Sequence, residues 1–160
     1  MTIAFDGTMR ASAAKTPAAS TAKALGPLPE WDLSHLYPSM DSALLKADLD
    51  RAMTESQRFA ALYRGKLLAL AEREDAGSAL AGAVKAFETL SDLLGRIGAY
   101  AGLVYAGDTT DPQRAKFYGD TQDRLNAAVT ELLFFELELN RIDPALLARI
   151  SAEGPPSHWK

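Results

Sequence analysis

The sequence LAGAVKAFETLSDLLGRIGAYAGLV, residues 80–104, carries the clearest helical pattern of this chain. Its large apolar side chains recur every three or four residues, the spacing that places them on one face of an α-helix. The members of this row are Leu80, Val84, Phe87, Leu90, Leu94, Ile97, Ala101 and Val104. The segment therefore predicts a long amphipathic helix that begins near Gly77 or Ser78 and ends before Gly107.

Three glycines interrupt the second half of this predicted helix, at Gly95, Gly98 and Gly102. Each glycine in a helix interior costs about 1 kcal/mol relative to alanine, so their presence requires a reason. They fall at helical spacing, which favours the close approach of a neighbouring helix. A flexible hinge is the alternative interpretation.

Similar apolar rows predict a long helix on each side of this one. The first covers residues 41–64 and is followed by Gly65, which suits the end of a helix. The other begins at the capping pair Asp111 and Pro112 and continues to about Asn140. A shorter helix or a turn is predicted at 67–70 and a short helix at 144–150, and no segment has clear strand periodicity. Short connections between helices indicate an all-α antiparallel bundle of about three long helices plus short ones.

The chain divides into three parts by composition. Residues 1–27 have few large apolar side chains and predict a disordered leader. Residues 28–150 predict one helical domain, and residues 151–160 an unstructured tail. Where the domain begins, the segment WDLSHLYP at 31–38 is expected to anchor the incoming chain on the helices. Its anchoring side chains would be Trp31, Leu33, Leu36 and Tyr37.

The last turns of the helix predicted to end near Asn140 are apolar on nearly all sides. Leu133, Phe134 and Leu137 widen its core face, and a helix of this kind is normally buried on several faces. These side chains present more apolar surface than a small bundle covers. We therefore expect a further partner domain to pack on them.

Composition and charge exclude several functions. The chain has 160 residues, a formal net charge of -4 and 0 cysteines. An acidic chain does not suit nucleic-acid binding or an anionic membrane surface, and its sequence offers no disulfide or thiolate metal site. The leader lacks the apolar core of a secretory signal, so a cytoplasmic location is expected. An amphipathic transit peptide stays open as an alternative, because the leader has few acidic residues.

The sequence contains no complete catalytic motif of a kind that we recognise. A zinc peptidase needs His-Glu-x-x-His, but neither His35 nor His158 is followed by this pattern. Ser34 and His35 are adjacent, and adjacent side chains on a helix or turn point apart. Asp108 and Asp111 lack the further oxygen ligands of a calcium loop, and capping explains Asp111.

Three acidic side chains near the end of the same long helix are the remaining candidates for acid–base chemistry. Glu131, Glu136 and Glu138 are more easily explained as solvated or ion-paired surface residues. The sequence therefore predicts no catalytic residue, no cofactor-binding residue and no metal ligand in this chain.

Several blocks of the sequence, taken in order, resemble the N-terminal domain of oligoendopeptidase F and its relatives in the thimet-type oligopeptidase family. The blocks are WDLS at 31–34 with LYP at 36–38, LGRIGAYAGLVYAGDTTDP at 94–112, KFYGD at 116–120, and LLFFELELN at 132–140. The resemblance covers roughly residues 28–150. It departs at His35, where many relatives carry an acidic residue.

The resemblance implies a role in peptide hydrolysis. Family members are zinc metallopeptidases whose N-terminal helices form one wall of a channel that admits short peptides. Their zinc motif lies far downstream, so this chain would be a fragment or N-terminal domain that is inactive alone. Its partners would be the C-terminal catalytic domain, which carries the zinc, and short peptides.

Two other functions are compatible with the sequence. A stand-alone helical interaction or scaffold module would keep the fold without peptidase activity. A complete small enzyme with an unfamiliar site is the third alternative, although such a site normally needs a visible cluster of titratable residues.

Overall fold

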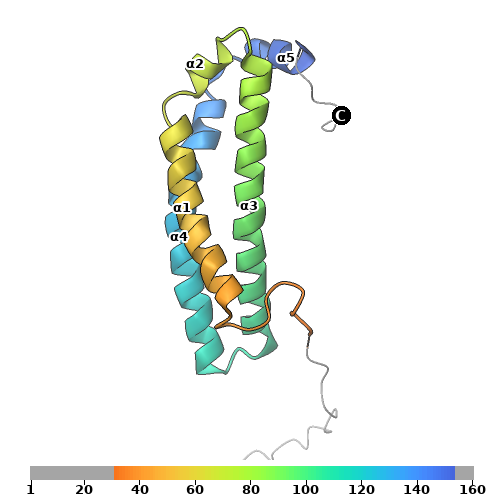
Figure 1. The fold of residues 1–160 in the computed structure, drawn as a ribbon, viewed down its shortest axis with the longest axis vertical. Helices are drawn as coiled ribbons and strands as arrows, with labels where there is room; N and C mark the ends of the chain where they lie inside the picture. Colours follow the sequence, from red (N-terminus) through yellow and green to blue (C-terminus); the bar gives the residue numbers. More distant parts are fainter. Residues whose placement is uncertain (1–30, 154–160) are drawn as a thin grey trace, which may run out of the picture.

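A computed structural model describes residues 31–153 of the chain. Three long helices lie side by side, with two short helices at one end of the molecule (Figure 1). The helices are α1 (Ala43–Tyr63), α2 (Leu67–Ala71), α3 (Ala76–Gly107), α4 (Pro112–Leu139) and α5 (Pro144–Glu153). Residues 31–153 contain no strand. The prediction of an all-α antiparallel bundle is therefore confirmed, while the leader predicted for residues 1–27 lies outside the described residues.

The core forms because the apolar row of each long helix faces the other two. Leu45 of α1 and Ile97 of α3 are completely buried, as is Leu67 of the short helix α2. Complete burial of one such side chain contributes about 1.5–3 kcal/mol. Buried residues of all five helices join in one continuous core cluster. The bundle thus has a single core that extends from the segment before α1 to α5.

An aromatic group joins the three long helices toward the end of the bundle that carries α2. The rings of Phe87 and Phe135 stack at 4.7 Å between centroids, which joins α3 to α4. Phe59 of α1 meets Phe135 edge to face at 5.1 Å. Such pairs contribute about 0.5–1.5 kcal/mol beyond the burial of their area.

Side-chain caps define where the helices begin. The Ser42 hydroxyl accepts the Leu45 N–H at the start of α1. The Asp111 carboxylate accepts the Gln113 N–H at 2.7 Å, so the cap predicted for α4 is confirmed. Gly65, which follows α1, has a φ of 77°, a left-handed conformation that glycine adopts without steric strain.

The last helix continues further than the sequence predicted. α5 extends to Glu153, past the end expected near Ile150, so the first residues of the predicted tail 151–160 are helical. Ser151, Ala152 and Glu153 are all compatible with a helix, and no glycine or proline stops it before Gly154. The rest of the predicted tail lies outside the described residues.

Within the described chain α4 is not buried on several faces, and the expectation that the bundle leaves apolar surface of α4 uncovered is confirmed. Leu133 is 56% exposed and Leu137 is 63% exposed. Phe134 is half-buried, with the Arg64 guanidinium 5.2 Å from the centre of its ring. With only two long neighbours, α4 cannot bury its whole circumference.

The glycines of α3 do not share one explanation. A Cβ atom on Gly98 would lie 3.4 Å from the Leu125 side chain, so close packing accounts for this position. A Cβ atom on Gly95 or Gly102 would meet no heavy atom within 4 Å. The packing interpretation is therefore wrong for Gly95 and Gly102 within the described chain. No described helix is both long enough and apolar enough to cross a membrane.

Candidate functional site

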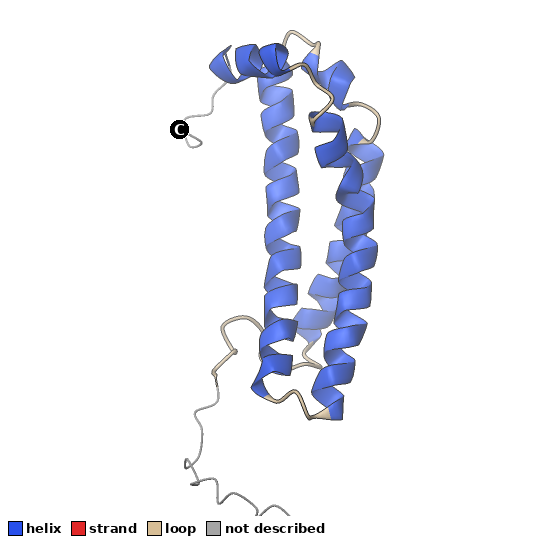
Figure 2. Cartoon of the chain, turned by 180° about the vertical axis from the view of Figure 1, so that it is seen from behind, coloured by secondary structure: helices blue, strands red, loops and turns tan. Residues whose placement is uncertain are grey.

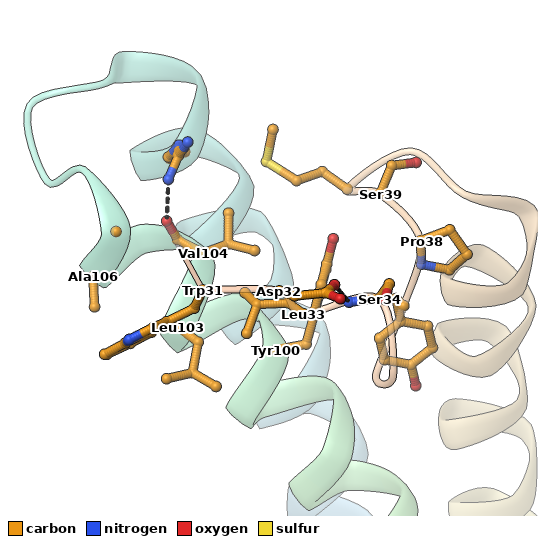
Figure 3. Close-up of a pocket in the computed structure, with 14 residues that line it drawn as sticks. Trp31, Asp32, Leu33, Ser34, Pro38, Ser39, Tyr100, Leu103, Val104 and Ala106 are labelled. Atoms are coloured by element: carbon orange, nitrogen blue, oxygen red, sulfur yellow. Dashed lines mark hydrogen bonds between the residues drawn. The ribbon is translucent and has the colours of Figure 1, made fainter. Parts of the chain in front are cut away.

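The candidate site is a hollow of about 690 Å³ between the segment that precedes α1 and the C-terminal end of α3 (Figure 3). Its volume lies in the range of small-ligand and peptide-side-chain sites. Residues 31–34 and 37–40 form one side, and Tyr100, Leu103, Val104, Ala106 and Gly107 form the other. Arg114 of α4 completes the lining.

The walls of this hollow are mainly aromatic and apolar, with a few polar groups. Trp31 lies beside Leu103 in Figure 3. The side chain of Trp31 is 64% exposed, so the prediction that it anchors the chain in the core is wrong. Leu33 and Leu36 are half-buried against the core. Tyr37 is buried and is the side chain that anchors this segment on the helices. Trp31 is left free to contact a ligand.

A local turn shapes the polar side of the hollow. The Asp32 carboxylate accepts the backbone N–H of Ser34 at 2.9 Å. Hydrogen bonding from the Ser34 side chain, then from its backbone, holds the pKa of Asp32 below its usual range. Asp32 is therefore a stable negative charge at the edge of the site.

Tyr37 connects the floor of the hollow to the helices. It is 1% exposed, and its hydroxyl donates to the Asp48 carboxylate at 2.8 Å. The Tyr100 ring meets it edge to face at 5.2 Å, and the Arg96 guanidinium lies 5.3 Å from its centre. Burial, and then the bond to Asp48, raise the pKa of Tyr37 to about 12. At neutral pH the phenol is a hydrogen-bond donor and not a base.

Asp48 is a buried carboxylate with its charge fully compensated. It is 4% exposed, forms an ion pair with Arg96 of α3, and lies 3.0 Å from the Arg51 guanidinium. Together with Tyr37 these groups join the entering segment, α1 and α3. Sequence reasoning did not single out Asp48. The available signal was an acidic residue beside Leu45, Leu49 and Ala52, all in the apolar row of α1.

Arg114 closes the site at the C-terminal end of α3. Its guanidinium donates to the Val104 carbonyl at 3.2 Å and lies 3.6 Å from the Asp111 carboxylate. A Cβ atom on Gly107 would come within 2.7 Å of this guanidinium, so glycine permits the close approach. A cation at the C-terminus of a helix also compensates the partial negative charge there.

The other residues that the sequence offered as candidates for chemistry are exposed or form local hydrogen bonds. Ser34 and His35 are exposed on the turn before α1. The Asp108 carboxylate accepts the hydroxyl of Thr110 at 2.7 Å and its backbone N–H at 2.9 Å, and these bonds, the first above all, lower the pKa of Asp108. Among residues 31–153 there is no group of three or more potential ligands that could hold a metal ion. His158 lies outside this range.

The three acidic residues of α4 do not converge on one point. Glu131 pairs with Arg64 at 2.8 Å. The Glu138 carboxylate accepts the backbone N–H of Gly65 at 2.7 Å and that of Leu67 at 3.4 Å, so it caps the start of α2. Glu136 is exposed. Glu131 and Glu138 therefore stabilise the junction of α1, α2 and α4.

Comparisons of the chain with protein-family models, with curated proteins and with solved structures give no match. The function is therefore proposed from the sequence blocks and from the geometry of the hollow. Its apolar walls suit large apolar side chains, and its polar groups can orient a bound backbone.

Proposed function

We propose that this chain is the non-catalytic N-terminal helical part of a zinc-dependent oligoendopeptidase and forms one wall of its substrate channel. The observation that carries the proposal is the meeting of two separate sequence blocks at one hollow. Residues 31–38 and 94–112 both belong to the blocks that resemble oligoendopeptidase F, and both contribute to the lining. A shared surface would give both segments, although they are distant in the sequence, a reason to resemble the same family.

The chemistry of the hollow suits the binding of unfolded peptides. Trp31 and Leu103 offer exposed apolar contact, while Asp32 and Ser34 offer hydrogen-bond acceptors and donors at the edge. Aromatic side chains provide large contact areas at a low entropic cost. In the proposed enzyme these residues bind and orient the peptide. The zinc ligands and the general base belong to the catalytic part.

The test is the activity of the protein isolated from its own cells. The natural protein is expected to cleave short internally quenched peptides. A zinc chelator should abolish the cleavage, and added Zn²⁺ should restore it. The recombinant 160-residue chain should cleave none of these peptides under the same conditions. A natural protein that is pure, folded and inactive on a broad peptide library would contradict the proposal.

A stand-alone helical interaction module is the second candidate. The observation that favours it is the single core cluster to which all five helices contribute. A chain with such a core should unfold cooperatively without a partner. Natural protein that has the mass of this chain and no peptidase activity would favour the module over the peptidase wall.

A further inference from the structure

An exposed apolar row runs along α4. Val129, Leu133 and Leu137 follow one another at intervals of four residues and are 41%, 56% and 63% exposed. Residues with this spacing lie above one another on a helix. Figure 2 shows α3 and α4 side by side from behind. The row therefore forms one continuous strip along the outside of the bundle.

The register of the two helices places this strip next to the glycines of α3. A Cβ atom on Gly98 would lie 3.4 Å from Leu125 of α4. Val129 lies one turn after Leu125 on α4, and Gly95 lies about one turn before Gly98 on α3. The two helices are antiparallel, so these two steps lead in the same direction along the bundle. Val129 and Gly95 thus lie at the same level of the bundle.

The side of α4 that faces α1 is a different one. Arg124 of α4 pairs with Asp50 of α1 at 2.6 Å, and Glu131 pairs with Arg64. At 100° per residue, Arg124 and Glu131 point to a different side of α4 from Val129 and the exposed strip. The strip and the glycines consequently lie on the same side of the α3–α4 pair, the side away from α1. We call this surface, formed by Val129, Leu133, Leu137, Gly95 and Gly102, the α3–α4 groove.

Gly95 and Gly102 leave the α3 side of this groove open. They lie seven residues apart on the same face, and a Cβ atom on either would meet no heavy atom within 4 Å. Alanine is the better helix former, and nothing in the described chain requires glycine at these positions. Small residues allow another helix backbone to approach closely. Both positions therefore suit contact with a helix outside residues 31–153.

Carboxylates outnumber cations in the parts of α3 and α4 that carry the strip and the glycines. Residues 88–106 and 117–137 contain two cations, Arg96 and Arg124, and each pairs with a carboxylate of α1. The same two stretches contain four carboxylates that form no ion pair with any described residue: Glu88, Asp92, Asp123 and Glu136. A ligand for this groove should carry positive charge.

We propose that the α3–α4 groove binds a basic amphipathic α-helix of a partner polypeptide. The apolar side of that helix covers Leu133 and Leu137, its backbone approaches Gly95 and Gly102, and its lysines or arginines reach the unpaired carboxylates. A second copy of this chain would bring two acidic rims together, and an anionic lipid surface would be repelled in the same way. The proposal does not depend on the function of the hollow.

The first experiment measures binding of a synthetic probe by isothermal titration calorimetry. The probe is a helical peptide with leucines on one face and lysines on the other, and its control carries glutamates in place of the lysines. The full chain should bind only the lysine peptide. Leu133→Ser should weaken binding about tenfold or more, as expected for a central apolar contact. Leu62→Ser is the matched control, because Leu62 is 53% exposed on α1.

The second experiment separates docking from folding. Gly95→Ala should raise the melting temperature of the chain, because the added methyl group meets no heavy atom within 4 Å and improves the helix. The same change should weaken peptide binding about fivefold or more if a helix backbone approaches Gly95. Gly82→Ala is the control, since Gly82 also has open space but lies on another face of α3. It should raise the melting temperature and leave binding unchanged.

The outcomes decide between the possible occupants. Loss of binding in Leu133→Ser and Gly95→Ala, with both controls unaffected, supports the proposal. Equal binding of the glutamate peptide, or unchanged affinity in both groove variants, overturns it. Light scattering that shows a dimer of the chain, dissociated by Leu133→Ser, would overturn it in favour of a second copy as occupant.

Discussion

Tyr37 and Asp48 form the contact that fixes the segment before α1 to the bundle. Both are almost completely buried, and two arginines compensate the carboxylate. Removal of one partner from such a group leaves a buried polar atom unpaired, which costs more than the net value of one hydrogen bond. Because the same segment lines the hollow, this contact also determines the shape of the candidate site.

Alkaline pH should release this contact. The pKa of Tyr37 is about 12 in the folded chain and 10.0 in its ordinary state, so folding favours the protonated phenol. Its contribution to stability is fully present below pH 10 and is lost as the pH rises toward 12. The free energy of unfolding, measured in urea, should therefore fall across this window. In Tyr37→Phe the fall should be shallower, with a remainder from Tyr100, whose pKa burial also raises. Equal slopes in the two proteins would contradict this account.

Ser56 is the one fully buried polar group without a partner in the described chain. Its hydroxyl forms no hydrogen bond and its side chain is 0% exposed. Ser56→Ala should raise the free energy of unfolding by about 1 kcal/mol, because it removes an unpaired hydroxyl and favours the helix. Ser91→Ala, on an exposed position of α3, reports the helical preference alone. Destabilisation by Ser56→Ala would show that the hydroxyl has a partner in solution.

Trp31 provides a direct probe of the hollow. In Trp159→Phe it is the single remaining tryptophan of the chain. Short unfolded peptides with large apolar side chains should change its fluorescence, because the exposed indole lies at the wall of the hollow. Leu103→Asp should abolish the change by placing a charge in the apolar wall. A response that is the same in both proteins would mean that peptides do not bind there.

At the scale of the elements, the carboxylate of Glu138 connects α4 to the start of α2. It accepts the backbone N–H groups of Gly65 and Leu67, as a helix cap does. Glu138→Ala should destabilise this junction by about 1 kcal/mol. Hydrogen exchange of the amides at 65–71 should accelerate, while that of α3 stays unchanged. Glu136→Ala is the control, because Glu136 is exposed and lies two residues before Glu138 on another face of α4. Unchanged exchange at 65–71 would exclude a capping role.

The helices could be predicted from the sequence because their causes are local. Apolar spacing identified α3, and the pair Asp111 and Pro112 located the start of α4 within one residue. The orientation of single side chains could not be predicted in the same way. Whether Trp31 or Leu133 is covered depends on which helices pack nearby, and spacing alone does not determine this. Asp48 was missed because its partners Tyr37 and Arg96 lie on other segments of the chain.

At the scale of the whole molecule, the chain combines a closed core with two open surfaces. The core includes residues from every helix, whereas the hollow and the α3–α4 groove expose apolar side chains to solvent. Exposed apolar surface of this kind suits contact with other molecules. A wall domain in a larger enzyme would use the hollow for peptides, and the groove would bind the basic helix of a partner.

The mass of the intact natural protein tests the central proposal most directly. It can be measured by mass spectrometry after isolation of the protein from its own cells, with identification by peptides from residues 100–124. A mass several times 17.2 kDa is expected, because the catalytic part would belong to the same polypeptide. A mass near 17.2 kDa would contradict the peptidase wall and leave the interaction module as the better explanation.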